Sequence, residues 1–316
     1  LWADRLGARR IYIISMFFTP PILFSYTIVN DFTAFCFLMF SSGVLLGAWG
    51  VSSRMLTATA SSERGRAFGM WQTMFSGAGL IGPAIGGYTA VIDYHLSFYV
   101  ATVLAAAALM LSLGVPGPEK TNFDGEASSP VSLNRAEKKF LTVISFLMIS
   151  PMFLMAVERT FIPVFCKETL LLGPREISWI FIIVGVVGLF SPLLSGELLG
   201  KAGMKKAILF GMALQASSFL LFATATEIIM LALVAAILGM GMALANPLMV
   251  ALLTEKMPSS KCGLALGVYG FFEDIGLTLG PLVGGLVYQS HGAQTVFFMT
   301  SGLVFSNMIP SAILLK

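Results

Sequence analysis

The chain has 316 residues, of which 57% are hydrophobic and only 11% are charged, and its formal net charge at pH 7 is +3. Because soluble domains carry roughly 25% charged residues, this composition, with a mean hydropathy of +0.88, excludes a soluble fold. It predicts an integral membrane protein and gives no indication of a nucleic-acid partner.

Long apolar runs divide the chain into segments that could each cross a bilayer, which takes about 20 helical residues. The runs lack the polar–apolar alternation of barrel strands, so helices are the expected spanning structure. Ten spans are predicted, at 11–29, 33–60, 67–92, 96–115, 140–163, 177–199, 207–225, 228–253, 264–288 and 294–315. We therefore expect an all-α membrane protein.

The positions of Lys and Arg predict the orientation of these spans, because cations are retained in cytoplasmic loops. If residue 1 lies inside, only Arg159, Lys167 and Arg175 of the 19 Lys and Arg residues fall on the outer side. Both ends of the sequence are then expected in the cytoplasm.

A polar stretch at 116–139 is rich in Pro, Gly, Ser and charge and is expected to be a cytoplasmic linker. It separates a bundle at 1–115 from a six-helix bundle at 140–316. The cysteines fall in unrelated places, at Cys36, Cys166 and Cys262, so the spacing predicts neither a disulfide framework nor a metal site.

One glycine pattern occurs twice inside apolar runs, 198 residues apart. The first copy contains Gly82 and Pro83, and the second contains Gly280 and Pro281. Small residues three or four apart let a neighbouring helix approach closely, and a proline beside them bends the helix. We expect these four residues to act in helix packing and conformational change.

A second repeat links residues 1–10 to 195–206, with Gly7 matching Gly203. Two helices precede the second copy, whereas nothing precedes the first. Two further helices are therefore expected upstream, which would give the intact protein twelve.

These features together resemble the major facilitator superfamily of secondary transporters. In this family an inner loop with its own sequence motif follows the second helix. The part of that loop that this sequence contains matches the motif at Leu1, Asp4, Arg5, Gly7, Arg9 and Arg10. A fifth-helix signature associated with proton-coupled efflux antiporters is matched by Gly69, Gly82, Pro83, Gly86 and Gly87. The resemblance implies a two-bundle fold with ten of twelve helices present, and it implies that Asp4, Arg5, Gly7 and Arg9 latch the inner face.

The chain departs from the drug antiporters in its fourth family helix. Many of them have an Arg four residues before a Gly, and here Met39 stands four residues before Gly43. That Arg is linked to proton coupling in the antiporters, so Met39 favours uptake or facilitated exchange.

Ionisable residues inside the spans are the main functional candidates, since a charge in a bilayer costs several kcal/mol unless it is paired or hydrated. Glu273 and Asp274 lie near the middle of the span 264–288. Burial favours the neutral form of a carboxyl group, so either acid could take up and release a proton. Asp274 is the preferred carrier because it directly precedes the Ile275–Gly276 groove and resembles an acid in some family members.

Other polar residues have more than one interpretation. Arg54 lies about 15 Å up its helix from Arg64, and it either attracts an anionic substrate or neutralises Asp274, or it snorkels to the inner headgroups. Glu158 and Arg159 form a structural ion pair or an outer gate. By the family's arrangement Gln72 and Asn246 are substrate contacts, whereas Gln215 is structural.

The sequence thus predicts a secondary transporter of a small organic solute that works by alternating access, and proton-coupled efflux is preferred. An uptake symporter, a facilitative exchanger and a transporter-like sensor or scaffold are the alternatives. No cofactor and no catalytic residue are predicted, since the chain has no nucleophile–base pair, metal cluster or phosphate loop. The expected partners are a small-molecule substrate, the lipid bilayer and protons, and the protein is expected to be a monomer.

Cysteine labelling tests the predicted topology. In a variant without native cysteines, single cysteines at Asp31, His95 and Lys167 should react with an impermeant thiol reagent from outside. Cysteines at Arg9 and Lys205 should not react, since the cation asymmetry places them inside. Outside labelling at both inner positions, with none at the outer ones, would contradict the ten-span arrangement.

Overall fold

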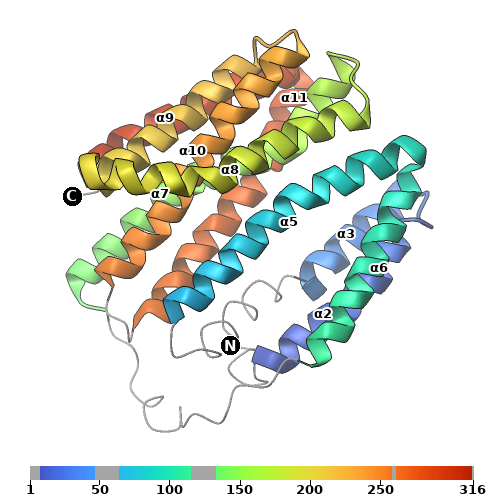
Figure 1. The fold of residues 1–316 in the computed structure, drawn as a ribbon, viewed down its shortest axis with the longest axis horizontal. Helices are drawn as coiled ribbons and strands as arrows, with labels where there is room; N and C mark the ends of the chain where they lie inside the picture. The colour runs from blue at the N-terminus through green and yellow to red at the C-terminus, as the bar shows by residue number, and fades with distance from the viewer. Residues whose placement is uncertain (1–7, 47–63, 115–132, 258–260, 315–316) are drawn as a thin grey trace. The chain divides into compact units, whose positions relative to one another are not determined.

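The computed structural model describes residues 8–46, 64–114, 133–257 and 261–314, and these residues form helices joined by short connections (Figure 1). The described part of the chain contains no strand. The helices are α2 (Ala8–Ser25), α3 (Phe32–Leu46), α5 (Arg64–Ile92), α6 (Tyr94–Leu113), α7 (Arg135–Glu168), α8 (Pro174–Ala202), α9 (Met204–Phe222), α10 (Ile228–Lys256) and α11 (Cys262–Leu314). The predicted all-α class is confirmed.

The last element is two helices joined at a sharp break. Gly292 has φ 78° and ψ 175° inside α11, in the left-handed region that glycine adopts without steric cost. The break falls between the predicted spans 264–288 and 294–315. We call residues 262–291 the first segment of α11 and residues 293–314 its second segment.

Several helices have the length and the apolar composition of membrane spans. Five helices among the described residues meet both conditions if α11 is counted once across its break, namely Tyr94–Leu113, Arg135–Glu168, Met204–Phe222, Ile228–Lys256 and Leu264–Ile313. Phe32–Leu45 and Gly77–Ile92 are apolar but shorter. The full count of ten spans stays a prediction.

The chain divides into two compact units. The first comprises Leu1–Ala78 and Ile85–Ser128, and the second comprises Gly79–Ala84 and Ser129–Lys316. The predicted bundle boundaries at 115 and 140 stay a prediction, since residues 115–132 lie outside the described part of the chain.

Within the first unit, α2 packs against α6 and α3. The ring of Tyr26 lies 5.6 Å from the rings of both Phe35 and Phe98, and its hydroxyl donates to Met39 Sδ at 2.9 Å. At the other end of α2, the Arg9 guanidinium donates to the Leu113 carbonyl oxygen at 3.3 Å.

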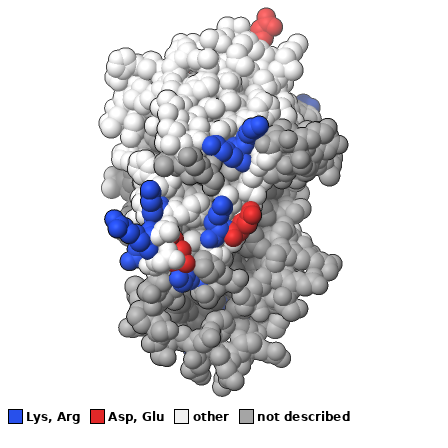
Figure 2. All heavy atoms as spheres, turned by 90° about the vertical axis from the view of Figure 1, so that its left-hand side faces the viewer, with Lys and Arg blue, Asp and Glu red and all other residues white. Residues whose placement is uncertain are grey.

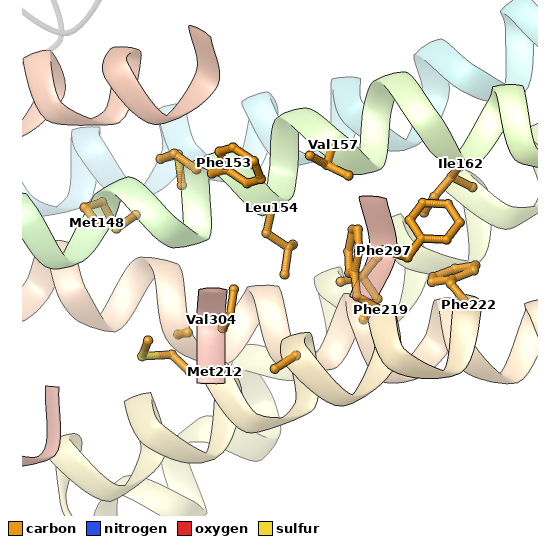
Figure 3. Packing of buried hydrophobic residues seen from close by; sticks show 14 of the residues in the cluster. Met148, Phe153, Leu154, Val157, Ile162, Met212, Phe219, Phe222, Phe297 and Val304 are labelled. Carbon is orange, nitrogen blue, oxygen red and sulfur yellow. The ribbon is translucent and has the colours of Figure 1, made fainter. Parts of the chain in front are cut away.

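The second unit is built around an apolar core between α7, α9 and the second segment of α11 (Figure 3). Phe297 lies at its centre, with ring centroids 5.3 Å from Phe165 and 5.7 Å from Phe219. Both contacts have the edge-to-face geometry that aromatic pairs prefer.

The first segment of α11 packs against α7 through a helix face made of glycines. Three glycines four residues apart make this face: Gly276, Gly280 and Gly284. A Cβ placed there would come within 2.7 Å of Met152 Cβ, 2.6 Å of Ala156 Cβ and 2.5 Å of Phe161 Cε2, respectively. Only glycine allows so close an approach, and such close packing is one of the contributions that hold helices together in a bilayer.

Polar contacts join the same two helices at both ends of this glycine face. At the start of α7, the Lys261 ammonium pairs with Glu137 at 2.8 Å, and Glu137 also completes a capping box with Asn134. At the other end of α7, the Tyr288 hydroxyl donates to the Glu168 carboxylate.

Basic side chains gather on one face of the second unit (Figure 2). Lys and Arg occur at the start of α7, at the start of α9, and where α10 ends and α11 begins. These helix ends lie at the left of Figure 1, the side that faces the viewer in Figure 2. The sequence assigns this side to the cytoplasm.

The two glycine repeats have different surroundings despite their matching sequences. A Cβ at Gly82 or Gly86 would meet no atom within 4 Å among the described residues, whereas Gly280 lies directly against α7. The expected close packing is therefore present at the second copy and absent at the first within the described part of the chain.

A pair of glycine-to-alanine variants tests this packing. Gly280→Ala should lower the thermal unfolding midpoint in detergent, because overpacking costs roughly 1–3 kcal/mol. Gly285→Ala is the matched control on the same helix, since its Cβ would meet no described atom within 4 Å. Equal midpoints for the two variants would contradict the proposed contact with α7.

Candidate functional site

The acids predicted inside the spans lie on two helices that pack together. Glu158 lies on α7, and Glu273 and Asp274 lie on the first segment of α11. The glycine face between the helices fixes their register, because Gly276 lies against Met152 and Gly284 against Phe161. The two helices therefore run parallel along this contact.

Glu158 is the most buried of these acids. Only 4% of its surface is exposed, and Leu154 and Ile162, one helical turn before and after it, are fully buried. Residues four apart lie on the same helix face. Glu158 thus belongs to the face of α7 that contributes these residues to the apolar core.

The predicted ion pair between Glu158 and Arg159 is not formed. Arg159 is exposed, whereas Glu158 is buried, because consecutive residues on a helix point about 100° apart. Among the described residues, no side chain makes a hydrogen bond or ion pair with the Glu158 carboxyl. The outer-gate role of the two residues stays a prediction.

The acids of α11 have a more open environment. Asp274 is exposed and Glu273 is half-buried. The Asp274 carbonyl oxygen accepts a hydrogen bond from the Thr278 hydroxyl at 2.8 Å, one turn further along. The glycine register places Glu158 level with about residue 282 of α11, hence roughly 12 Å along the axis from Asp274.

A buried amide pair joins α9 to α10. Gln215 is fully buried, and its Nε2 donates to the Gly241 carbonyl oxygen at 3.1 Å and to Asn246 Oδ1 at 3.4 Å. Its Oε1 has no hydrogen-bond partner among the described residues. The backbones are close here, since a Cβ at Gly211 would lie 2.9 Å from the Gly241 carbonyl oxygen. Asn246, which is half-buried, is therefore held by Gln215 at the edge of this contact.

A further amide was missed by the sequence analysis. Asn307, in the second segment of α11, donates to the Leu147 carbonyl oxygen at 2.7 Å and also to the Ser150 hydroxyl. Its signal was an amide inside the apolar span 294–315. The contact ties α7 to this segment of α11.

Several predicted residues cannot be assigned to the site. Asp4, Arg5, Gly7 and Arg54 lie outside the described residues, and Gln72 lies on α5 in a part whose side chains are not described. Pro83 and Pro281 lie within α5 and α11, where a proline removes one backbone hydrogen bond. Among the described residues, no three His, Cys, Asp or Glu side chains are grouped so that they could hold a metal ion.

The family model described as Major Facilitator Superfamily matches residues 1–170 and 140–316, which together cover the whole chain. The chain is 20% identical to the quinolone resistance protein NorA of Staphylococcus aureus (strain COL), over 97% of this chain and 80% of NorA. It is 24% identical to the class D tetracycline resistance protein of Salmonella ordonez, over 96% of this chain and 79% of that protein.

Solved structures show the same fold. The D-xylose–proton symporter superposes with a TM-score of 0.75 at 18% identity, over 98% of this chain and 81% of the symporter. At 18% sequence identity, the structural comparison shows the fold alone. The family model, in contrast, matches the whole sequence.

Variants of the amide pair should separate stability from substrate binding. Gln215→Ala should lower the thermal midpoint, since it removes a buried hydrogen bond worth roughly 1 kcal/mol and leaves a cavity. If Asn246 contacts substrate, Asn246→Ala should instead raise the KM for transport with a smaller loss of stability. Transport kinetics and thermal unfolding of both variants check this, and an unchanged KM in Asn246→Ala would remove Asn246 from the site.

Proposed function

Because the chain belongs to the major facilitator superfamily, whose members are transporters and not enzymes, we propose that it exports a small organic solute in exchange for protons. Alternating access of two bundles to a midplane site is the mechanism that suits such a fold. The proposal rests mainly on the acids of α7 and α11. Placing an ionisable side chain inside a membrane helix costs free energy, so such residues usually have a function.

The direction of transport is inferred from the relatives and from the glycine signature. Both reported relatives are named as drug resistance proteins, against quinolones and tetracycline, and export is the way a transporter protects a cell from a drug. The signature at Gly82, Pro83 and Gly86 is the one associated with efflux antiporters. An amphipathic organic solute is the cargo that we propose.

Uptake is the second candidate, and two observations favour it. Met39 occupies the position at which many drug antiporters have an Arg, and its sulfur accepts a hydrogen bond from Tyr26. One of the structural neighbours is a proton symporter for D-xylose. The direction of proton flow relative to solute flow distinguishes symport from antiport.

Residue roles follow from this mechanism. Asp274 carries the proton, with Glu273 as the alternative, and Arg54, Gln72 and Asn246 line the solute pathway. Asp4, Arg5, Gly7 and Arg9 latch the inner face during the cycle. Gly82, Pro83, Gly280 and Pro281 permit the helices to bend and repack. The protein works as a monomer in the cell membrane, with both ends of this sequence in the cytoplasm.

Neutral variants of the α11 acids test the proton-coupled mechanism. Tetracycline and a quinolone serve as probes in proteoliposomes with an imposed proton gradient. Asp274→Asn should abolish gradient-driven accumulation while probe exchange across the membrane persists, because the amide keeps the shape of the acid but cannot titrate. Glu255→Gln, at the exposed end of α10, is the control and should transport normally.

Other outcomes have definite meanings. Full gradient-driven transport in Asp274→Asn with an inactive Glu273→Gln would move the role to Glu273. Movement of protons and probe in the same direction in the unmodified protein would contradict antiport and establish symport.

A further inference from the structure

We propose that Asn307, in the second segment of α11, is a positioning residue for transport. Its side chain supplies the hydrogen bond that Pro151 removes from α7, and it thereby keeps the interrupted turn of α7 in one conformation at the level of Asp274. The proposal rests on the proton-coupled mechanism above, because it gives Asn307 a part in how α7 is presented to the proposed proton carrier.

The interruption of α7 follows from the chemistry of proline. Pro151 lies inside α7 and is buried. A proline has no backbone N–H, so the Leu147 carbonyl oxygen, four residues earlier, loses the hydrogen bond that an α-helix would give it. An unpaired carbonyl oxygen is costly inside a membrane, and a proline is tolerated there when a neighbouring helix supplies another donor.

Asn307 is that donor. Its Nδ2 donates to the Leu147 carbonyl oxygen at 2.7 Å and also to the Ser150 hydroxyl, so both contacts fall on the turn of α7 that ends at Pro151. Val304 is three residues before Asn307 and therefore on the same helix face, and it is fully buried in the apolar core. The packing of this face thus directs the Asn307 amide into the bundle.

The same turn of α7 also contacts the first segment of α11. A Cβ at Gly276 would lie 2.5 Å from the Ile149 carbonyl oxygen and 2.7 Å from Met152 Cβ. Asp274 precedes Gly276 by two residues, hence roughly 3 Å along the helix axis. The turn that Pro151 interrupts is therefore contacted by both segments of α11, and it lies level with the proposed proton carrier.

Loss of the Asn307 amide should act on α7 at this level. Helices kink where the i→i−4 hydrogen bonds are interrupted, so without the amide the two halves of α7 can take more than one angle about Pro151. Turnover, which needs Asp274 in a defined arrangement, should then become slower. The KM for the solute should change little, because Asn307 is outside the proposed solute pathway.

A double-variant cycle in the full chain tests the link between Asn307 and Pro151. Asn307→Leu keeps the approximate size of the side chain and removes its donor, whereas Pro151→Ala restores an N–H that can bond to the Leu147 carbonyl oxygen. In a cysteine-free background, spin labels on Lys139→Cys and Lys167→Cys, exposed positions near the two ends of α7, report the distance between these ends. The distance distribution should broaden in Asn307→Leu and become narrow again when Pro151→Ala is added.

Tetracycline transport in proteoliposomes with an imposed proton gradient tests the part in transport. Asn307→Leu should lower kcat about fivefold, the factor that corresponds to one hydrogen bond, and Pro151→Ala should restore kcat. Ser301→Ala is the matched control, since the Ser301 hydroxyl donates to the Ala216 carbonyl oxygen of α9 at 2.8 Å. It removes a buried hydrogen bond between helices without affecting α7, so it should lower the thermal midpoint and leave kcat unchanged.

A distance distribution in Asn307→Leu that is as narrow as in the unmodified protein, or that stays broad after Pro151→Ala is added, would overturn the proposal. Equal losses of kcat in Ser301→Ala and Asn307→Leu would also overturn it, because Asn307 would then only stabilise the bundle. Should Asn307→Leu fail to fold, Pro151→Ala should restore folding, and its failure to do so would have the same meaning. If the distances change as expected but the unmodified protein exchanges neither tetracycline nor a quinolone for protons, the hydrogen-bond replacement at Pro151 stands and the antiport function fails.

Discussion

The close contact between α7 and the first segment of α11 is the interaction on which the rest of the second unit depends. Apolar surface gains little by moving from lipid to a helix interface, so packing and polar contacts must hold membrane helices together. Glycines at 276, 280 and 284 supply the packing. The pair Glu137–Lys261 and the hydrogen bond between Tyr288 and Glu168 add polar contacts at the two ends.

This contact also determines how the acids are arranged. Glu158 belongs to α7, whereas Glu273 and Asp274 belong to α11. Because the register is set by the glycines, the buried acid and the exposed acid are held at different depths of the same helix pair. Glu158 lies beside the apolar core, whereas Asp274 is exposed. We infer that α7 and the first segment of α11 stay in contact along the glycine face during transport.

Much of the fold could be predicted from the sequence. Apolar runs located the helices, and the gap between the runs 264–288 and 294–315 marked the break at Gly292. The loop and glycine motifs indicated the superfamily, which the match over the whole chain confirmed. These features are local, since they depend on residue types at fixed spacings along one segment.

The surroundings of individual side chains were harder to predict, because they depend on which helices meet. The glycine repeats have matching sequences, yet within the described residues only Gly280 of the pair Gly82 and Gly280 lies against another helix. The sequence suggested a structural ion pair or an outer gate for Glu158 and Arg159, because charges collect at helix ends. Consecutive residues on a helix point about 100° apart, so one of them is buried and the other is exposed. Asn307 was missed because a single amide in an apolar run does not reveal its partners.

Cross-linking of α7 to α11 tests the central claim, that the two helices stay in contact at both ends of the glycine face. In a cysteine-free background, cysteines would replace Glu137 and Lys261 in one variant and Glu168 and Tyr288 in another, and each pair would be joined by a short, reducible bifunctional thiol reagent. Transport of tetracycline or a quinolone should be the same before and after cross-linking in both variants. Loss of transport on cross-linking, with recovery on reduction, would show that α7 and α11 must separate during the cycle and would contradict the account.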